Sequence, residues 1–164
     1  TSFSGRQVIL TPHEGEAGRL CSVDSKTIRT DRQRWVRRLA LQRGATVVLK
    51  GAYSECGDPS GRVYINPTGN AGMATAGSGD VLAGIIGCFL AQMNDDPLHA
   101  AALGTYVHGL AGDMISGQSS QRSLVASDLI KQLPEVFARL EKVEPADGIA
   151  YPETIAEDGL AIIR

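Results

Sequence analysis

The sequence predicts an α/β fold, in which two or three strands of one sheet are joined through helices. The first observation behind this prediction is Ala45–Leu49, a continuous apolar run rich in valine, which is typical of a strand buried on both faces. The second is the helical spacing of apolar residues before and after that run. The third is size and composition, because 164 residues with 43% apolar and 21% charged content suit one globular domain with its own core.

Two further strands are expected in the first half of the chain. Gln7–Leu10 is a short apolar run that leads into a threonine–proline loop. Arg62–Asn66 alternates apolar and polar residues and follows a turn-forming segment at 58–61. Together with the central run, these segments supply the predicted sheet.

A helix is expected between the first two strands. Thr30 or Asp31 could cap its start, and Gly44 would end it after Arg43. Its apolar residues recur at helical spacing on one face. The basic residues on the rest of the helix are interpreted as a solvated face, with an anionic partner as the less favoured alternative: Arg32, Arg34, Arg37 and Arg38.

Three helices are expected in the second half. Val81–Met93 is apolar almost all round, which predicts a helix buried against the sheet. Another helix starts at Pro97 and reaches about Ile115. Leu124–Leu140 is the third, and Pro134 is expected to bend or split it. Because the predicted strands are few and the chain starts almost on one of them, we expect it to be part of a larger domain.

Charge and hydropathy exclude several classes of protein. Sixteen Lys and Arg residues against eighteen Asp and Glu give a net charge of −2, so no basic surplus indicates a nucleic-acid partner. The longest apolar run, Val81–Ala91, is too short for a membrane span, and no charged-then-apolar leader opens the chain. Three dispersed cysteines are typical of free thiols in a reducing compartment. We therefore expect a cytoplasmic protein.

The most informative segment is the glycine-rich run Asn66–Gly87, NPTGNAGMATAGSGDVLAGIIG. Glycines let backbone N–H groups approach a bound anion, and a helix that starts just after Gly79 would add the positive end of its dipole. The segment therefore predicts an anion cradle, with phosphate as its commonest occupant, although it is neither a Walker A loop nor a clean Rossmann motif. Asp80 could be the helix cap or the base that takes a proton from an attacking hydroxyl, and the spacing favours neither.

Two other segments could contribute to a site. Thr11–Glu16 follows the first strand, where α/β proteins place ligands, yet His13 is also explained as an exposed turn residue beside a solvated acidic pair. A metal site there would need more ligands than the segment offers. Lys50 could reach a phosphate, but its position favours a residue that marks the solvent end of a strand. Three residues farther along are assigned structural roles: His99, His108 and Asp113.

These segments, in this order and spacing, resemble the ADP/ATP-dependent NAD(P)H-hydrate dehydratase family. The resemblance rests on ILTPHEGEAGRL, VVLKGAYS and the glycine-rich run, and ASDLIKQLPEVFARL resembles the family's closing helix. It implies a ribokinase-like three-layer fold, of which residues 1–140 would be the C-terminal portion and 141–164 a tail of unassigned role. Family members carry a substantial segment before the Thr-Pro-His motif, so the resemblance implies a missing N-terminal part as a possible partner. It also implies a homo-oligomer.

The resemblance also implies a reaction. Family members phosphorylate the 6-hydroxy adduct of NADH or NADPH with ATP or ADP and then eliminate phosphate to restore the cofactor. Asp80 would activate the hydroxyl, His13 would contact the hydrated dinucleotide, and Mg²⁺ would bridge the phosphates. Gly77, Ser78 and Gly79 would hold the transferred phosphoryl group. The residues implied to border the adenine nucleotide are Lys50, Gly51, Ala52, Tyr53, Ser54, Asn70, Ala71, Gly72, Met73, Ala74, Thr75, Ala76, Gly77, Ser78 and Gly79.

Two alternatives stay open at this point. The first is a small-molecule kinase of the same fold that acts on a sugar or a vitamin precursor, because a glycine loop followed by aspartate is common to that group. The segment Asn70–Thr75 and the His13 motif favour the dehydratase. The second is a nucleotide-binding or purely structural fragment without catalysis.

Overall fold

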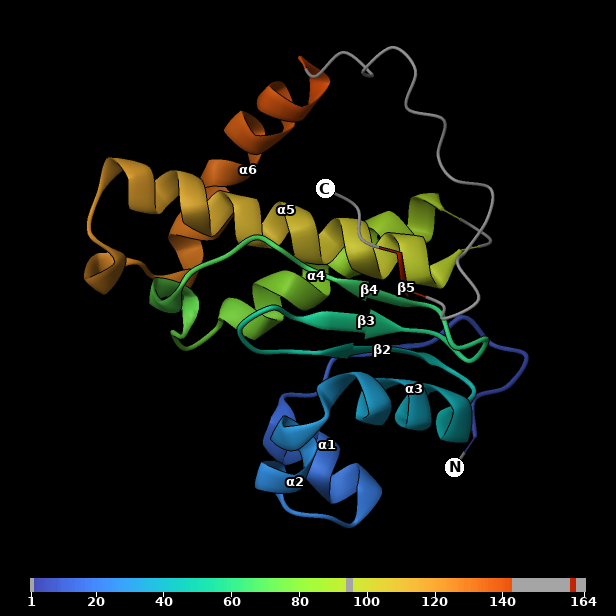
Figure 1. Ribbon diagram of the computed structural model, residues 1–164. Coiled ribbons are helices and arrows are strands. Elements are labelled where there is room, and N and C mark those ends of the chain that lie inside the picture. The colour runs from blue at the N-terminus through green and yellow to red at the C-terminus, as the bar shows by residue number, and fades with distance from the viewer. Residues whose placement is uncertain (1, 94–95, 143–159, 162–164) are drawn as a thin grey trace.

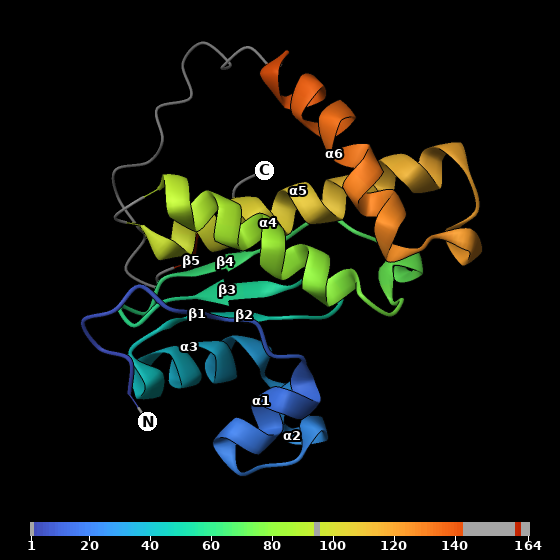
Figure 2. The same cartoon turned by 180° about the vertical axis from the view of Figure 1, so that it is seen from behind.

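The computed structural model describes residues 2–93, 96–142 and 160–161 of the chain. Its helices are α1 (Glu14–Cys21), α2 (Ser25–Thr30), α3 (Arg32–Arg43), α4 (Ser78–Gln92), α5 (Pro97–Gln118) and α6 (Ala126–Glu141), with short 3-10 helices η1 (Ala71–Met73) and η2 (Gln121–Ser123). Helices α1, α2 and α3 lie on one side of a central sheet (Figure 1). Helices α4 and α5 cover the other side, and α6 packs against them (Figure 2). The three-layer α/β prediction is therefore confirmed.

The sheet is mixed. Its strands are β1 (Ile9–Leu10), β2 (Thr46–Leu49), β3 (Glu55–Gly57), β4 (Val63–Ile65) and β5 (Leu160–Ala161), and they lie side by side in chain order. The β1–β2 and β4–β5 pairs are parallel, whereas β3 runs antiparallel to both of its neighbours. As a result, β1, β2 and β4 all end at the same edge of the sheet. That edge carries the predicted site.

The central strand β2 is buried along its whole length, as its apolar run predicts. Because side chains alternate across a strand, Val47 and Leu49 pack toward α3, while Val48 packs toward α4 and α5. On the first side they meet the apolar face of α3, including Trp35 and Leu39. One continuous run of sequence therefore supplies two cores.

The helix predicted at 32–43 forms with the expected ends. The Asp31 carboxylate accepts a hydrogen bond from Arg34 N at 3.2 Å, and Gly44 ends α3 in the left-handed conformation with φ +61°. The interpretation of its arginines as a solvated face is wrong for Arg32. The Arg32 side chain is only 15% exposed and lies among acidic groups at the site.

Helix α4 differs from its prediction in two respects. It begins at Ser78 rather than after Gly79, and it is not buried all round, because Ala83, Gly84, Gly87 and Cys88 are exposed. A helix made of small apolar residues does not show from sequence which face the core covers. The three cysteines are free, as expected.

The last predicted helix forms as α6 and continues through Pro134 without splitting. Most of the predicted tail, 141–164, lies outside the described residues, and its described part includes β5 beside β4. Within the described part of the chain, no helix combines the length and apolar content needed to cross a membrane.

Candidate functional site

The chain segments that follow β1 and β2 stay together at the edge of the sheet. His13 and Lys50 form an isolated parallel bridge beyond the two strands, and Lys50 N donates to Pro12 O at 2.9 Å. The Thr-Pro-His motif and the lysine are 37 positions apart in the sequence, yet their backbones are neighbours. The parallel pairing of β1 with β2 therefore builds one part of the site from two motifs.

His13 caps helix α1, which the interpretation as a simple turn residue missed. Its Nδ1 atom accepts hydrogen bonds from Gly15 N at 3.0 Å and Glu16 N at 3.2 Å, while the Glu16 carboxylate accepts from His13 N at 2.7 Å. This is the capping-box arrangement, with histidine in place of serine or threonine. Because backbone N–H groups only donate, Nδ1 is an acceptor here, and Nε2, which lies 3.5 Å from Glu16 Oε1, is the ring nitrogen that can donate.

Lys50 extends from the end of β2 toward the glycine-rich segment. Its Nζ atom lies 3.8 Å from Glu16 Oε2, and its side chain is 26% exposed. A Cβ atom added at Gly79 would lie 3.3 Å from Nζ, so the ammonium group is beside the start of α4. The hydrogen bond from His13 N, helped by the charge of Lys50, lowers the pKa of Glu16. Lys50 thus lies at the end of its strand, as expected, and also reaches the predicted anion cradle.

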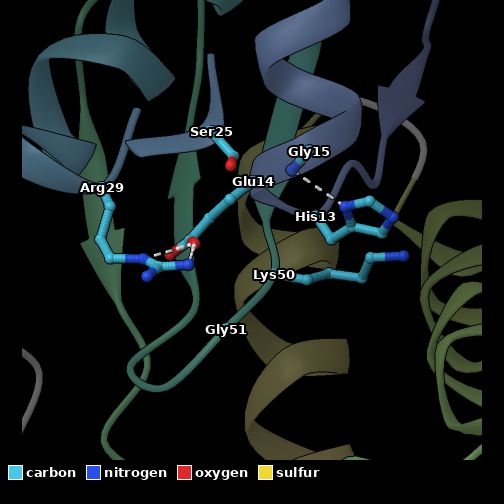
Figure 3. Close-up of a pocket in the computed structure, with 7 residues that line it drawn as sticks. All are labelled: His13, Glu14, Gly15, Ser25, Arg29, Lys50 and Gly51. Atoms are coloured by element: carbon cyan, nitrogen blue, oxygen red, sulfur yellow. Dashed lines mark hydrogen bonds and ion pairs between the residues drawn. The ribbon is translucent and has the colours of Figure 1, made fainter. Parts of the chain in front are cut away.

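A shallow pocket of about 370 Å³ opens beside His13 and Lys50 (Figure 3). This volume is near the lower end of the range for small-molecule sites. The Lys50 side chain extends alongside the His13 ring, and Arg29 meets Glu14 on the other side of the opening (Figure 3). The remaining residues that line the pocket are Gly15, Ser25 and Gly51.

A partly buried ion network supports this pocket, and sequence reasoning missed it. Arg32 lies 2.7 Å from Glu14 Oε1 and donates to Leu49 O at 2.8 Å. It also lies 3.4 Å from Glu55 Oε1 on β3. The hydrogen bond from Arg29, helped by the charges of Arg29 and Arg32, lowers the pKa of Glu14. The interpretation of Glu14 as part of a solvated acidic pair is therefore wrong, because Glu14 is paired with Arg29 and Arg32. The network also joins the start of α1 to the end of β2.

The glycine-rich segment turns sharply before α4. Gly77 precedes the helix with φ +83°, a left-handed conformation that favours glycine, and no side chain caps α4 among the described residues. Asp80 is the third residue of the helix and is exposed, so the interpretation of Asp80 as the helix cap is wrong. An exposed carboxylate thus lies beside an uncapped, electropositive helix end. Ser78, in contrast, is buried, and its hydroxyl lies 3.3 Å from His108 Nε2.

The other segments predicted to border the nucleotide lie at the same end of the sheet (Figure 1). The loop after β2 is closed by Ser54, whose hydroxyl accepts from Gly51 N at 3.2 Å and donates to Gly51 O at 3.1 Å. Ala52 and Tyr53 are exposed at its tip, and Tyr53 has a φ of +55°. The predicted residues 71–73 form η1, which lies against α5 and η2. The nucleotide contacts themselves stay a prediction.

The site offers oxygen ligands rather than a preformed metal cage. Among the residues that the structure describes, no group of three His, Cys, Asp or Glu side chains could hold a metal ion. Mg²⁺ commonly binds through one or two carboxylates together with substrate phosphates and water. The exposed Asp80 carboxylate beside the uncapped start of α4 is compatible with a cation held mainly by phosphate oxygens and water.

Solved structures share this fold. The ADP/ATP-dependent NAD(P)H-hydrate dehydratase from Bacillus subtilis, co-crystallised with ATP and Mg²⁺, matches with a TM-score of 0.80 at 34% identity, over 85% of this chain and 50% of that one. A ribokinase-like superfamily protein from Enterococcus faecalis matches with a TM-score of 0.69 at 30% identity, over 85% of this chain and 47% of that one. The fold, with loops that form the site at one edge of the sheet, therefore defines a ribokinase-like α/β protein.

A sequence profile of NAD(P)H-hydrate dehydratase matches residues 2–135, and the chain belongs to this family. The bifunctional NAD(P)H-hydrate repair enzyme of Moorella thermoacetica is 49% identical over 135 residues, which are 82% of this chain and 25% of that enzyme. The ADP-dependent (S)-NAD(P)H-hydrate dehydratase of Neisseria meningitidis is 47% identical over 110 residues, or 67% and 37% of the two chains. This chain thus spans half or less of the length of these relatives, and its similarity to part of a longer enzyme is confirmed.

Proposed function

We propose that the chain carries the phosphoryl-transfer site of an ADP- or ATP-dependent NAD(P)H-hydrate dehydratase, which returns hydrated NADH and NADPH to their active forms. The observation that carries this proposal is the convergence of His13, Lys50 and the start of α4 at one edge of the sheet. Family membership supports the substrate class. A cytoplasmic location remains part of the proposal.

The proposed reaction has two steps. The 6-hydroxyl oxygen of the hydrate attacks the terminal phosphorus of ATP or ADP, and its proton passes to the Asp80 carboxylate. The leaving nucleotide is ADP from ATP, or AMP from ADP. In the second step the bond between C6 and the ester oxygen breaks, inorganic phosphate leaves, and a proton is lost from the neighbouring ring carbon. The ring double bond is thereby restored without any change in oxidation state.

Each residue has a role that suits its position. The backbone of Gly77, Ser78 and Gly79, together with the α4 dipole, would hold the transferred phosphoryl group. Lys50 would neutralise charge on the phosphates from the other side of the cradle. His13 would donate from Nε2 to the hydrated dinucleotide. Mg²⁺, when bound with the nucleotide, would supply charge neutralisation at the phosphates, held mainly by phosphate oxygens and water, so that Asp80 stays free to act as the base.

The test measures the return of NADH absorbance after the protein is mixed with hydrated NADH, Mg²⁺ and ADP or ATP. We expect nucleotide-dependent recovery, and we expect Asp80→Asn to lower the rate by roughly 10²–10⁴-fold while nucleotide binding persists. The matched control is Asp96→Asn, because Asp96 caps α5 beside Arg62 at the opposite edge of the sheet and asparagine caps equally well. The Bacillus subtilis relative serves as the positive control for the assay.

Three results would contradict parts of this proposal. A stable phosphorylated product in place of released phosphate would indicate a small-molecule kinase. Nucleotide binding without turnover of any hydrate would indicate a binding module. Equal rates for wild type and Asp80→Asn would exclude Asp80 as the base.

A further inference from the structure

Helix α5 presents one face to the glycine-rich segment, and the proposed function leaves that face without a role. The residues on it are His108, Gly109, Gly112 and Asp113. Their spacing of one, four and five positions places them on the same side of a helix. Both ends of the segment from Asn66 to Ser78 are fixed by contacts with this face of α5.

Asp113 holds the first end. Its Oδ2 atom accepts a hydrogen bond from Gly69 N at 2.8 Å, and its Oδ1 atom accepts from Asn70 Nδ2 at 3.0 Å. The Asn70 Oδ1 atom in turn accepts from Gly72 N at 3.0 Å. Gly69 is itself in the left-handed region, with a φ of +103°, a conformation that glycine adopts readily. One carboxylate on α5 is therefore bonded directly to Gly69 and Asn70 and, through the Asn70 side chain, to Gly72.

The two glycines let the loop approach the helix closely. A Cβ atom at Gly109 would overlap Thr68 Oγ1 and come within 2.7 Å of the Thr68 carbonyl carbon. One at Gly112 would overlap Met73 Sδ. The Thr68 hydroxyl also donates to Tyr106 O at 3.0 Å, which adds a side-chain bond to the same contact. The loop thus lies directly on the helix backbone.

His108 holds the other end. The imidazole is buried, and its Nε2 atom lies 3.3 Å from the hydroxyl of Ser78, the first residue of α4. Burial lowers the pKa of His108 to about 4, against a smaller raising effect of Ser78, so the ring is neutral at pH 7. A neutral ring and a hydroxyl can share one hydrogen bond without an uncompensated buried charge. This contact joins the start of α4 to α5.

We propose that Asp113 and His108 are positioning residues, which hold the two ends of the glycine-rich segment so that its N–H groups and the α4 N-terminus converge on one phosphate. The proposal rests on the proposed function for the identity of the ligand. The ordering of the loop by α5 is a separate claim and can be measured without a ligand. Neither residue is expected to touch the reacting atoms.

The test uses an exchange of partners between Asp113 and Asn70. In Asp113→Asn, the side chain has only one acceptor oxygen, and its other end is an amide nitrogen that donates. It can therefore accept only one of the two hydrogen bonds from the loop. In the double variant Asn70→Asp with Asp113→Asn, the donor and acceptor are reversed, and all three hydrogen bonds can form again. The matched control is Asp96→Asn at the start of the same helix, far from the loop.

Two readouts separate positioning from the proposed function. The first is hydrogen–deuterium exchange of the amides at 69–72 in the ligand-free protein. The second is the Kd for ADP or ATP with Mg²⁺, measured by calorimetry. For Asp113→Asn we expect at least tenfold faster exchange and about tenfold weaker nucleotide binding. The double variant should recover both to within about threefold of wild type, and Asp96→Asn should change neither.

His108 is tested with a similar pair. His108→Gln keeps a polar nitrogen near the position of Nε2, whereas His108→Leu fills the space but leaves the Ser78 hydroxyl without its partner. We expect His108→Leu to weaken nucleotide binding about tenfold and to speed exchange at 77–80, and His108→Gln to stay within threefold of wild type. Equal values for the two variants would exclude the hydrogen bond as the positioning contact.

The outcomes distinguish the two proposals. Unchanged exchange at 69–72 in Asp113→Asn, or a folded double variant that recovers nothing, would overturn the positioning role. If the exchange follows the expected order but wild type binds neither ADP nor ATP, the positioning role stands and the nucleotide site fails. If the protein binds nucleotide and amide exchange follows the expected order, but hydrated NADH is not turned over, only the substrate assignment fails.

Discussion

His13 stabilises helix α1 and faces the pocket with the same ring. Its Nδ1 atom is occupied by two backbone N–H groups, so the ring can rotate little and Nε2 keeps one direction. The Glu16 carboxylate serves both as the return half of the cap and as a neighbour of Lys50. Side chains that are already held by hydrogen bonds in the folded protein lose little conformational entropy when they bind a ligand.

The buried His108 side chain should make the free energy of unfolding depend on pH. Because burial lowers the pKa of His108 in the folded protein to about 4 from 6.5, the unfolded chain binds more protons between those values. Stability should therefore fall as the pH drops below 6.5, by roughly 2 kcal/mol at pH 5 from this group. His108→Gln removes this loss. The measurement is urea denaturation of both proteins at pH 7 and pH 5.

The comparison must be made between variants, because other groups also titrate in this range. Burial raises the pKa of Glu55, against the lowering effect of Arg32, and its contribution to stability changes in the opposite direction with pH. His99→Gln, at an exposed histidine on the same helix, is the matched control and should keep the wild-type pH profile. An equally steep loss in His108→Gln and wild type would show that His108 is not held neutral.

At the scale of elements, the sequence predicted those with a strong local pattern. The runs that became β2, α3 and α5 are long or continuously apolar, and their ends carry caps, proline or glycine. Strand β3 was missed because it has only three residues, one of them glutamate and another glycine, and it is strand only through its bonds to β2 and β4. Local propensity contains no information about such pairing.

Helices α1 and α2 were missed for a different reason. Both are short, of eight and six residues, and α1 carries two glycines, so the apolar periodicity is weak. The signal that could have found α1 is the His13-to-Glu16 spacing, which matches a capping box if histidine is admitted as the cap. The partly buried network around Arg32 had no such signal, because its partners lie 17 to 23 residues away in the sequence.

The contact between α5 and the loop makes a prediction at this scale. Gly109→Ala places a methyl group within 2.8 Å of the Thr68 backbone, so loop or helix must shift, and we expect a loss of about 1–3 kcal/mol in the free energy of unfolding. Gly117→Ala, on the same helix but with open space around it, should be neutral or stabilising by up to about 1 kcal/mol. Urea denaturation of both variants measures the difference. A free energy of unfolding for Gly109→Ala that equals or exceeds that of Gly117→Ala would mean that the close approach at Gly109 carries no cost.

At the scale of the whole molecule, the mixed sheet explains why motifs far apart in sequence form one site. Strands β1, β2 and β4 end at one edge, so the loops after them converge there, with α1 on one side of the sheet and α4 on the other (Figure 1). Sequence alone could nominate His13, Lys50 and Asp80 one motif at a time. It could not show that Lys50 crosses from the α1 side to the start of α4, because that depends on the packing of both layers.

A ligand that bridges those two sides should stabilise the whole fold. ADP or ATP with Mg²⁺ at about 100 times its Kd adds about 2.7 kcal/mol, which for a domain of this size is a rise in Tm of roughly 5–10 °C. Lys50→Met removes the charge between the two sides, and tenfold weaker binding would roughly halve that rise at the same nucleotide concentration. Without nucleotide its Tm should stay near wild type, because the partly exposed pair with Glu16 contributes less than about 1 kcal/mol. Lys131→Met, at an exposed lysine on α6, is the matched control and should show the full rise. An undiminished rise in Lys50→Met would mean that the lysine only ends its strand, and that the phosphates are held by the backbone of the glycine-rich segment alone.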